Sequence, residues 1–124
     1  MLSINYKDPR PIYEQVRDAL RQLILSGAIA PGEKLPSVRE LAASLAINPN
    51  TIQRSYRELE KLGLVNTVAG KGAFAATDGT AALRWREELM ATLSSTLREL
   101  KLLGVSESEL QSMVLAAFRK EDET

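Results

Sequence analysis

The fold of this chain is decided by the stretch Asn48-Pro-Asn-Thr-Ile-Gln-Arg-Ser-Tyr-Arg-Glu-Leu-Glu-Lys-Leu-Gly63. This stretch predicts one helix with clear ends, because Asn48 is a good N-cap, Pro49 suits the first helical position and Gly63 is a stop signal. Within the helix, apolar side chains recur at helical spacing and would face a core. These side chains are Ile52, Tyr56, Leu59 and Leu62.

The outer face of this predicted helix is rich in amides at its start and cationic further on. Its side chains are Asn50, Gln53, Arg54, Arg57 and Lys61. Asn and Gln can make paired hydrogen bonds to an adenine edge, Arg can make them to guanine, and Arg or Lys can hold phosphates. The helix is therefore a candidate DNA-recognition helix, although the same pattern also fits an ordinary solvated face.

A short helix is predicted directly before this one. Ser37-Val-Arg-Glu40 forms a capping box, in which Ser37 accepts from the third helical N–H and Glu40 bonds back to the Ser37 N–H. The helix would extend to about Leu45. Its buried side chains would be Val38, Leu41, Ala42 and Leu45. Two short helices joined by a tight turn are the helix-turn-helix arrangement.

A β-hairpin is predicted after the recognition helix. Two strand-like runs, residues 64–69 and 73–76, flank Gly70-Lys71-Gly72. A hairpin that follows a helix-turn-helix is a wing, whose lysine and bare glycine amides can approach a DNA backbone or minor groove. The alternative is a plain surface turn with one exposed lysine.

The chain before these elements predicts one more helix, over about residues 11–26. Its apolar positions follow the helical period, and Gly27 ends it. Residues 1–10 are an extended lead-in arm. Residues 28–36 contain two prolines and are too broken for a helix, with room for a very short strand around residues 33–35.

Two amphipathic helices are predicted beyond a small polar hinge at residues 77–80. The first, of about 23 residues, has a coiled-coil-like seam and ends at Gly104. The second, of about 14 residues, opens with the capping box Ser106-Glu-Ser-Glu109. The apolar positions of the two helices are Leu83, Met90, Leu93, Leu97 and Leu100, then Leu110, Met113, Val114, Ala117 and Phe118.

These two apolar faces exceed what a small domain can cover. We therefore expect them to pair with the same helices of a second chain, giving a homodimer. The alternative is that they fold back onto their own first domain. Two helices are also too little to enclose a ligand pocket within one chain, so an effector, if one exists, would bind at the dimer interface or would not be a typical metabolite.

The composition excludes several classes of function. The chain has 124 residues with no cysteine and no histidine. Disulfide frameworks and thiolate sites are therefore excluded, and the commonest general base and metal ligand are missing. With no phosphate-binding glycine loop and no paired carboxylates in an evident cleft, we expect no enzyme, no cofactor and no metal.

The chain also lacks the sequence pattern of a membrane or secreted protein. No apolar run approaches a membrane span, and the first residues lack a signal-peptide pattern. We therefore expect a cytoplasmic protein with no membrane partner.

The formal net charge of +0 conceals a mild asymmetry. Residues 1–79 carry ten Lys and Arg against eight Asp and Glu, whereas residues 80–124 carry six against eight. This distribution fits a first part that faces DNA and a second part that does not, although a neutral chain could show it by chance.

Several motifs occur in a characteristic order along the chain. They are Pro11-Ile-Tyr-Glu-Gln15, Gly27, Pro31-Gly-Glu-Lys-Leu-Pro-Ser-Val-Arg-Glu-Leu-Ala42, Asn48-Pro-Asn-Thr-Ile52, Leu59-Glu-Lys-Leu-Gly-Leu64 and Gly70-Lys-Gly72. Over about residues 10–76 this set resembles the winged-helix domain of GntR-family bacterial transcription regulators. The Asn-Pro-Asn-Thr start of the recognition helix and the short helical tail are similar to the YtrA-like subgroup of that family.

The pattern and the resemblance together predict a mainly α fold with a small β-hairpin. A winged helix-turn-helix domain would span residues 1–77, and a helical dimerisation segment would span residues 78–124. The candidate DNA-binding residues are Ser37, Arg39, Asn48, Asn50, Thr51, Gln53, Arg54, Arg57, Gly70, Lys71 and Gly72. Pro49 and Gln53 stand where many family members have Arg, so the bases preferred by the wider family do not transfer to this chain.

The favoured function is a homodimeric, sequence-specific regulator that binds a palindromic operator in double-stranded DNA and represses transcription. The resemblance implies control of a neighbouring operon, such as one for a transporter. A winged-helix module that binds another protein and never touches DNA stays open as the alternative. The sequence identifies neither the operator nor an effector.

Overall fold

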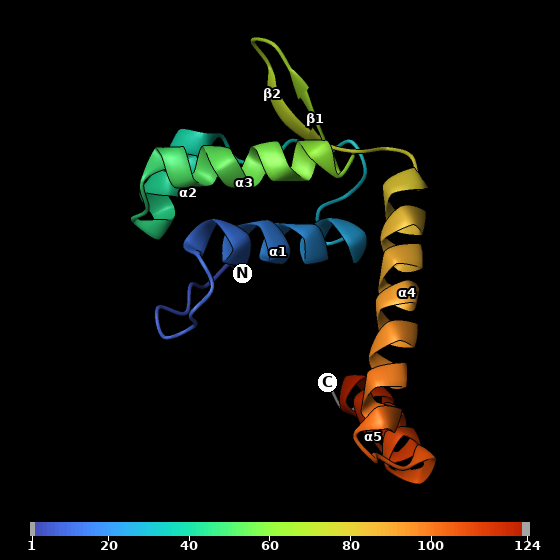
Figure 1. Cartoon of the computed structure of the whole chain (residues 1–124). Coiled ribbons are helices and arrows are strands. Elements are labelled where there is room, and N and C mark those ends of the chain that lie inside the picture. Colours follow the sequence, from blue (N-terminus) through green and yellow to red (C-terminus); the bar gives the residue numbers. More distant parts are fainter. Residues whose placement is uncertain (1, 123–124) are drawn as a thin grey trace. The chain divides into compact units, whose positions relative to one another are not determined.

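The computed structural model describes residues 2–122, with residues 120–122 described by their backbone alone. The elements in chain order are α1 (Ile12–Leu25), α2 (Val38–Leu45), α3 (Pro49–Lys61), β1 (Val65–Val68), β2 (Gly72–Ala75), α4 (Thr80–Leu102) and α5 (Glu107–Asp122) (Figure 1). This order confirms the predicted mainly helical fold with one small hairpin. The chain divides into two compact units, with the boundary between Arg84 and Trp85.

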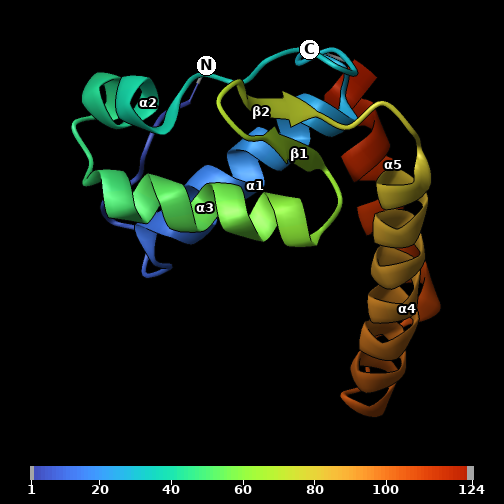
Figure 2. The same ribbon diagram turned by 90° about the horizontal axis from the view of Figure 1, so that it is seen from above.

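The core of the first unit lies where α3 packs against α1 and α2. In Figure 2, α2 lies beside the N-terminal part of α3 and the hairpin lies beside its C-terminal part. The largest fully buried apolar side chains are Val16, Leu20, Leu35, Ile52, Leu59 and Val65. Three of the four apolar positions predicted for α3 are buried, and the fourth, Leu62, packs partly buried against the same cluster.

The ends of α3 are those that the sequence predicts. The Asn48 side-chain oxygen accepts a hydrogen bond from the Asn50 backbone N–H at 2.8 Å, and Pro49 occupies the first turn. At the other end Gly63 adopts a φ of +78°, which L-residues rarely adopt. The Leu64 N–H then bonds back to the Leu59 carbonyl at 3.0 Å, which terminates the helix.

One of the two hydrogen bonds predicted for the capping box of α2 is formed. Ser37 Oγ accepts from the Glu40 N–H at 3.0 Å, as predicted. The predicted return bond from the Ser37 N–H to the Glu40 carboxylate is not among the bonds of the described residues, so this half of the capping box was wrong. Ala46, in the left-handed conformation at φ +55°, ends the helix and gives the tight turn into α3.

The hairpin is the predicted wing, and it is attached to the loop before α2. Its strands pair in antiparallel register from Val65 opposite Ala75 to Val68 opposite Gly72. The prediction that Gly72 lies in the tip was wrong: Gly72 belongs to β2, because it pairs with Val68. An isolated bridge joins Lys34 to Phe74, in the segment around residues 33–35 where the sequence left room for a very short strand.

The second unit consists of most of α4 and of α5. The 23 residues of α4 match the predicted length, while α5 has 16 residues where about 14 were predicted. Gly104 at φ +86° separates the two helices, and Ser106 Oγ accepts from the Glu109 N–H at 3.2 Å. Among the described residues no helix is long and apolar enough to cross a membrane.

Candidate nucleic-acid interface

A groove of about 240 Å³ lies between α3, the start of α2 and the wing. Its lining contains five of the candidate DNA-binding residues. These are Ser37, Gln53, Arg57, Lys71 and Gly72. The fold therefore brings the N-cap of α2, the outer face of α3 and the wing, which are distant in the sequence, to one surface.

Two hydrogen bonds fix the walls of this groove. The Tyr56 hydroxyl donates to the Pro36 carbonyl at 2.6 Å, which ties α3 to the segment before α2. Burial, with a smaller contribution from the charge of Glu40, raises the pKa of Tyr56 to about 12, so the phenol stays a donor at neutral pH. On the wing side, Thr67 donates to the Glu60 carboxylate at 2.7 Å and holds β1 against α3.

Lys34 also lines the groove, and the sequence analysis missed it. A Cβ added at Gly72 would lie 3.0 Å from Lys34 Cε, so the lysine stem passes close over the start of β2. Leu35 is only 2% exposed, and neighbours in an extended segment point to opposite sides. The short strand was expected, and its alternation could have placed Lys34 on the outer surface.

The cations of this surface are left free by the rest of the chain. Lys34, Arg57 and Lys71 line the groove, Arg39 lies on α2 outside this lining, and all four side chains are exposed. Among the described residues none of them forms an ion pair with a carboxylate. The one carboxylate in the groove, Glu60, is held by Thr67.

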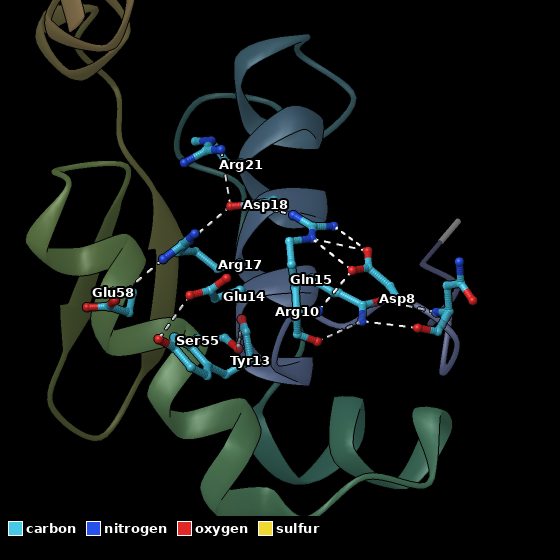
Figure 3. Close-up of polar contacts among 11 residues, drawn as sticks. Asp8, Arg10, Tyr13, Glu14, Gln15, Arg17, Asp18, Arg21, Ser55 and Glu58 are labelled. Atoms are coloured by element: carbon cyan, nitrogen blue, oxygen red, sulfur yellow. Dashed lines mark hydrogen bonds and ion pairs between the residues drawn. The ribbon is translucent and has the colours of Figure 1, made fainter. Parts of the chain in front are cut away.

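The arginines on α1 and on the arm before it have the opposite arrangement (Figure 3). Arg10 pairs with Asp8 at 3.0 Å and with Asp18 at 2.9 Å, and its side-chain hydrogen bond lowers the pKa of the Asp8 carboxyl. Asp18 Oδ1 also forms ion pairs with Arg17 Nε at 2.9 Å and with Arg21 Nη2 at 3.1 Å.

A further pair on this side joins two helices. Arg17 reaches across from α1 to Glu58 on α3 at 3.5 Å. The neutral total charge of the chain thus hides a neutralised surface on α1 and a free cationic surface around the groove, which is the distribution that attracts a polyanion.

The remaining candidates on α3 differ in how accessible they are. The Asn48 oxygen is occupied by its cap, although its amide N–H groups stay available. Asn50 is exposed one residue beyond Pro49, while Thr51 is half-buried. Gly70 lies in the turn of the wing, where it adopts a φ of +76°.

Arg54 lies outside the groove. Its guanidinium carbon lies 3.7 Å from the centre of the Tyr13 ring, on the side of α3 that faces α1. The residue that follows it, Ser55, is fully buried and donates to the Tyr13 carbonyl at 2.8 Å. Periodicity predicted Arg54 as a surface residue but gave no sign of its aromatic partner.

Nothing in the described part of the chain indicates a metal centre. No group of three or more His, Cys, Asp or Glu side chains there could hold a metal ion. The polar side chains of the groove are an amide, hydroxyls, cations and one carboxylate, and the first three kinds can bind nucleic acid through hydrogen bonds and charge.

Comparison with known proteins supports this assignment. Residues 12–75 match the family model described as "Bacterial regulatory proteins, gntR family". The chain is 38% identical over 100 residues to the HTH-type transcriptional repressor YtrA of Bacillus subtilis, a match that covers 81% of this chain and 75% of the relative. This similarity confirms the resemblance to the YtrA-like subgroup.

Solved structures of transcription regulators are also similar to this chain. A GntR family transcriptional regulator from Listeria monocytogenes has a TM-score of 0.74 and 34% identity, over 88% of this chain and 96% of that one. The DNA-binding domain of AraR in complex with operator ORE1 has a TM-score of 0.53 and 30% identity, over 60% of this chain and 90% of that one.

Proposed function

Because this chain belongs to the GntR family of bacterial regulatory proteins, we propose that it is a homodimeric repressor that binds a palindromic operator through α3 and the wing. Members of this family are DNA-binding transcription regulators, so the predicted absence of enzymatic function is confirmed by the family. The dimer, the symmetry of the operator and the roles of single residues are the proposal.

The free cations around the groove are the observation that carries the proposal. Three cations, Lys34, Arg57 and Lys71, line the groove with one carboxylate, Glu60, and none of the three forms an ion pair within the described part of the chain, so most of their charge lacks compensation there. Phosphates supply that compensation, and release of their counterions drives binding. These cations therefore hold the DNA backbone, whatever the base sequence.

Base reading is assigned to the amides at the start of α3. Asn50 and Gln53 are exposed and lie on the outer face of the helix. An amide side chain can pair with the N6 and N7 atoms of adenine in the major groove. Gln53 also lines the groove beside the wing, which is held by the Glu60–Thr67 bond. The wing thus helps to fix the approach of α3.

Dimerisation is assigned to α4 and α5. Their apolar side chains remain exposed in the single chain, with Met113 at 63% and Phe118 at 69% exposed. An apolar groove of about 810 Å³ also lies between the two helices, with Leu97, Val105 and Leu110 among its lining. A second copy would bury these surfaces, and each Å² of apolar area removed from water would stabilise the dimer by about 25 cal/mol. The pairing would be two-fold, which matches a palindromic operator.

Repression is proposed from the relatives. YtrA of Bacillus subtilis is named a repressor, and the AraR structure contains an operator. A dimer bound to an operator blocks transcription by occupying it. Control of a neighbouring operon, such as one for a transporter, is carried over from the YtrA-like subgroup.

Selection of bound DNA from a random pool tests the proposal. We expect a two-fold symmetric motif, because a symmetric dimer presents two identical copies of α3. The affinity for this motif should fall for Arg57→Ala and Lys71→Ala on every sequence, whereas Gln53→Ala should chiefly relax base preference by about 1–3 kcal/mol. Equal losses for Gln53→Ala on operator and random DNA would remove it from base reading.

A matched control is available on α4. Arg98→Ala removes the same charge from a side chain that, within the described part of the chain, bonds to Ser94 on its own helix. Its DNA affinity should remain that of the parent. Failure to recover any bound DNA at low salt would favour the alternative, a winged-helix module that binds another protein.

A further inference from the structure

Arg54 is held by an aromatic ring and by no carboxylate. Its guanidinium lies over Tyr13 at 3.7 Å from the ring centre. The carboxylate one turn further along α3, Glu58, is engaged by Arg17 at 3.5 Å and by Lys61 at 3.8 Å. Among the described residues Arg54 therefore forms no ion pair with a carboxylate.

Tyr13 is itself fixed to α3. Its carbonyl accepts a hydrogen bond from Ser55 Oγ at 2.8 Å, and Ser55 is fully buried between the two helices. Its phenol donates to Glu14 at 3.3 Å, so the hydroxyl is directed along α1. This bond holds the Tyr13 backbone against α3, and the half-buried ring lies beneath the Arg54 guanidinium.

A guanidinium over a ring face is attracted to it but does not use its N–H groups there. Those donors lie in the plane of the guanidinium and remain available to an anion with two oxygens in reach. Because the ring restricts the long side chain beforehand, less side-chain entropy is lost when the anion binds. Arg54 is exposed, so an anion can reach it.

We propose that Tyr13 is a positioning residue for DNA binding, whose ring holds Arg54 ready for a backbone phosphate on the α1 side of α3. The groove would then hold one stretch of backbone and Arg54 another, on the opposite edge of the same helix. This inference rests on the proposed DNA-binding function. It adds α1, so far only a packing helix, to the elements that determine affinity.

The test is a double-mutant cycle in the full chain, with a duplex that carries the selected motif. Tyr13→Phe keeps the ring and should bind within about twofold of the parent. Tyr13→Leu should weaken binding by roughly two- to fivefold per bound subunit, the range of an exposed cation–π contact. Arg54→Ala should weaken binding by at least as much and lower the salt slope by about one per subunit.

The double variant separates positioning from a general effect on folding. If Tyr13 acts through Arg54, Tyr13→Leu should cost nothing further in the Arg54→Ala background. Equal losses from Tyr13→Leu in both backgrounds, or unchanged binding by Tyr13→Leu in the parent, would overturn the inference. A parent that binds no DNA would overturn it together with the proposed function, whereas the first two results leave that function intact.

Discussion

The Arg84 guanidinium donates a hydrogen bond to the Leu62 carbonyl oxygen, 3.1 Å away. Leu62 is the C-cap of α3, where carbonyl groups lack partners and a cation is favoured by the helix dipole. Ala81, one turn earlier in α4, is buried in the core of the first unit. The N-terminal part of α4 therefore completes the end of α3.

This contact makes Gly63 a sensitive position. A Cβ there would lie 2.8 Å from the Arg84 Nη2 atom, and the residue has a φ of +78°. We expect Gly63→Ala to lower the free energy of unfolding by about 1–2 kcal/mol, mostly from the left-handed backbone. Urea denaturation measures this loss. Gly79→Ala is the matched control because a Cβ there meets nothing within 4 Å, and equal losses at both positions would contradict the explanation.

The stability of the first unit should respond to alkaline pH through Tyr56. Burial raises the pKa of its phenol from 10.0 to about 12, so the folded state disfavours the phenolate. The resulting stability is complete below pH 10 and is lost as the pH rises through 12. Tyr56→Phe should cost about 1 kcal/mol at pH 7, because the bond to the Pro36 carbonyl is lost.

The parent and the Tyr56→Phe variant should differ less in their free energy of unfolding as the pH rises. Above pH 10 the free energy of unfolding of the parent should decline more steeply than that of Tyr56→Phe, measured by urea denaturation at each pH. Parallel profiles for the two proteins between pH 9 and pH 12 would show that the phenol does not cause the alkaline loss.

Local signals predicted most of the fold, and contacts across the chain explain the rest. The ends of α3 follow from Asn48, Pro49 and Gly63, because capping depends on neighbours in the sequence. The place of Lys34 on the groove follows from its pairing with the wing, which comes 40 residues later.

In the candidate site, too, local signals predicted exposure but not the contacts between distant segments. Helical periodicity predicted Arg54 and Arg57 as exposed, and both are. It could not show that Arg54 lies over Tyr13 while Arg57 lines the groove, because these partners belong to other elements. Total charge was least informative, since only the structure shows which cations are already paired.

The salt dependence of DNA binding should report the free cations. If three or four cations of each subunit neutralise phosphates, a dimer displaces about six to eight counterions and the log–log slope should be about −5 to −7. Lys34→Ala should reduce the magnitude of the slope by about two for a dimer, while Arg98→Ala should leave it unchanged. Fluorescence anisotropy titrations over a range of salt concentrations provide the slope. A value near zero would contradict backbone binding by this surface.

The proposed dimer interface can be disrupted with charges. Leu93 and Leu97 lie on the seam of α4 and are 50% and 37% exposed in the single chain. Replacing both with Glu should give a folded monomer in sedimentation, because burying two unpaired carboxylates per chain is unfavourable. The control is Thr92→Glu with Ser95→Glu, which adds the same charge at exposed positions away from the seam. A dimer that persists in the Leu93/Leu97 variant would contradict the interface.

Loss of the dimer should also weaken binding to DNA. When one subunit of a dimer is bound, the other subunit is held near its half-site at an effective concentration in the millimolar range. This raises the affinity by about 10²–10⁴. A chain shortened to residues 1–84 retains Ala81 and Arg84, so it should fold and bind a palindromic site at least about a hundredfold more weakly. Equal affinity for the shortened and full chains would contradict the role assigned to α4 and α5.

The wing is attached along both of its strands. On β2, the Leu35 N–H donates to the Ala73 carbonyl at 2.8 Å and the Ala75 N–H donates to the Glu33 carbonyl at 2.9 Å. On β1, Thr67 bonds to Glu60. A free two-stranded hairpin is marginally stable and would have to become ordered on DNA. Here the hairpin is already ordered when the chain folds, so in the proposed complex the wing meets DNA as a preorganised, nearly rigid surface.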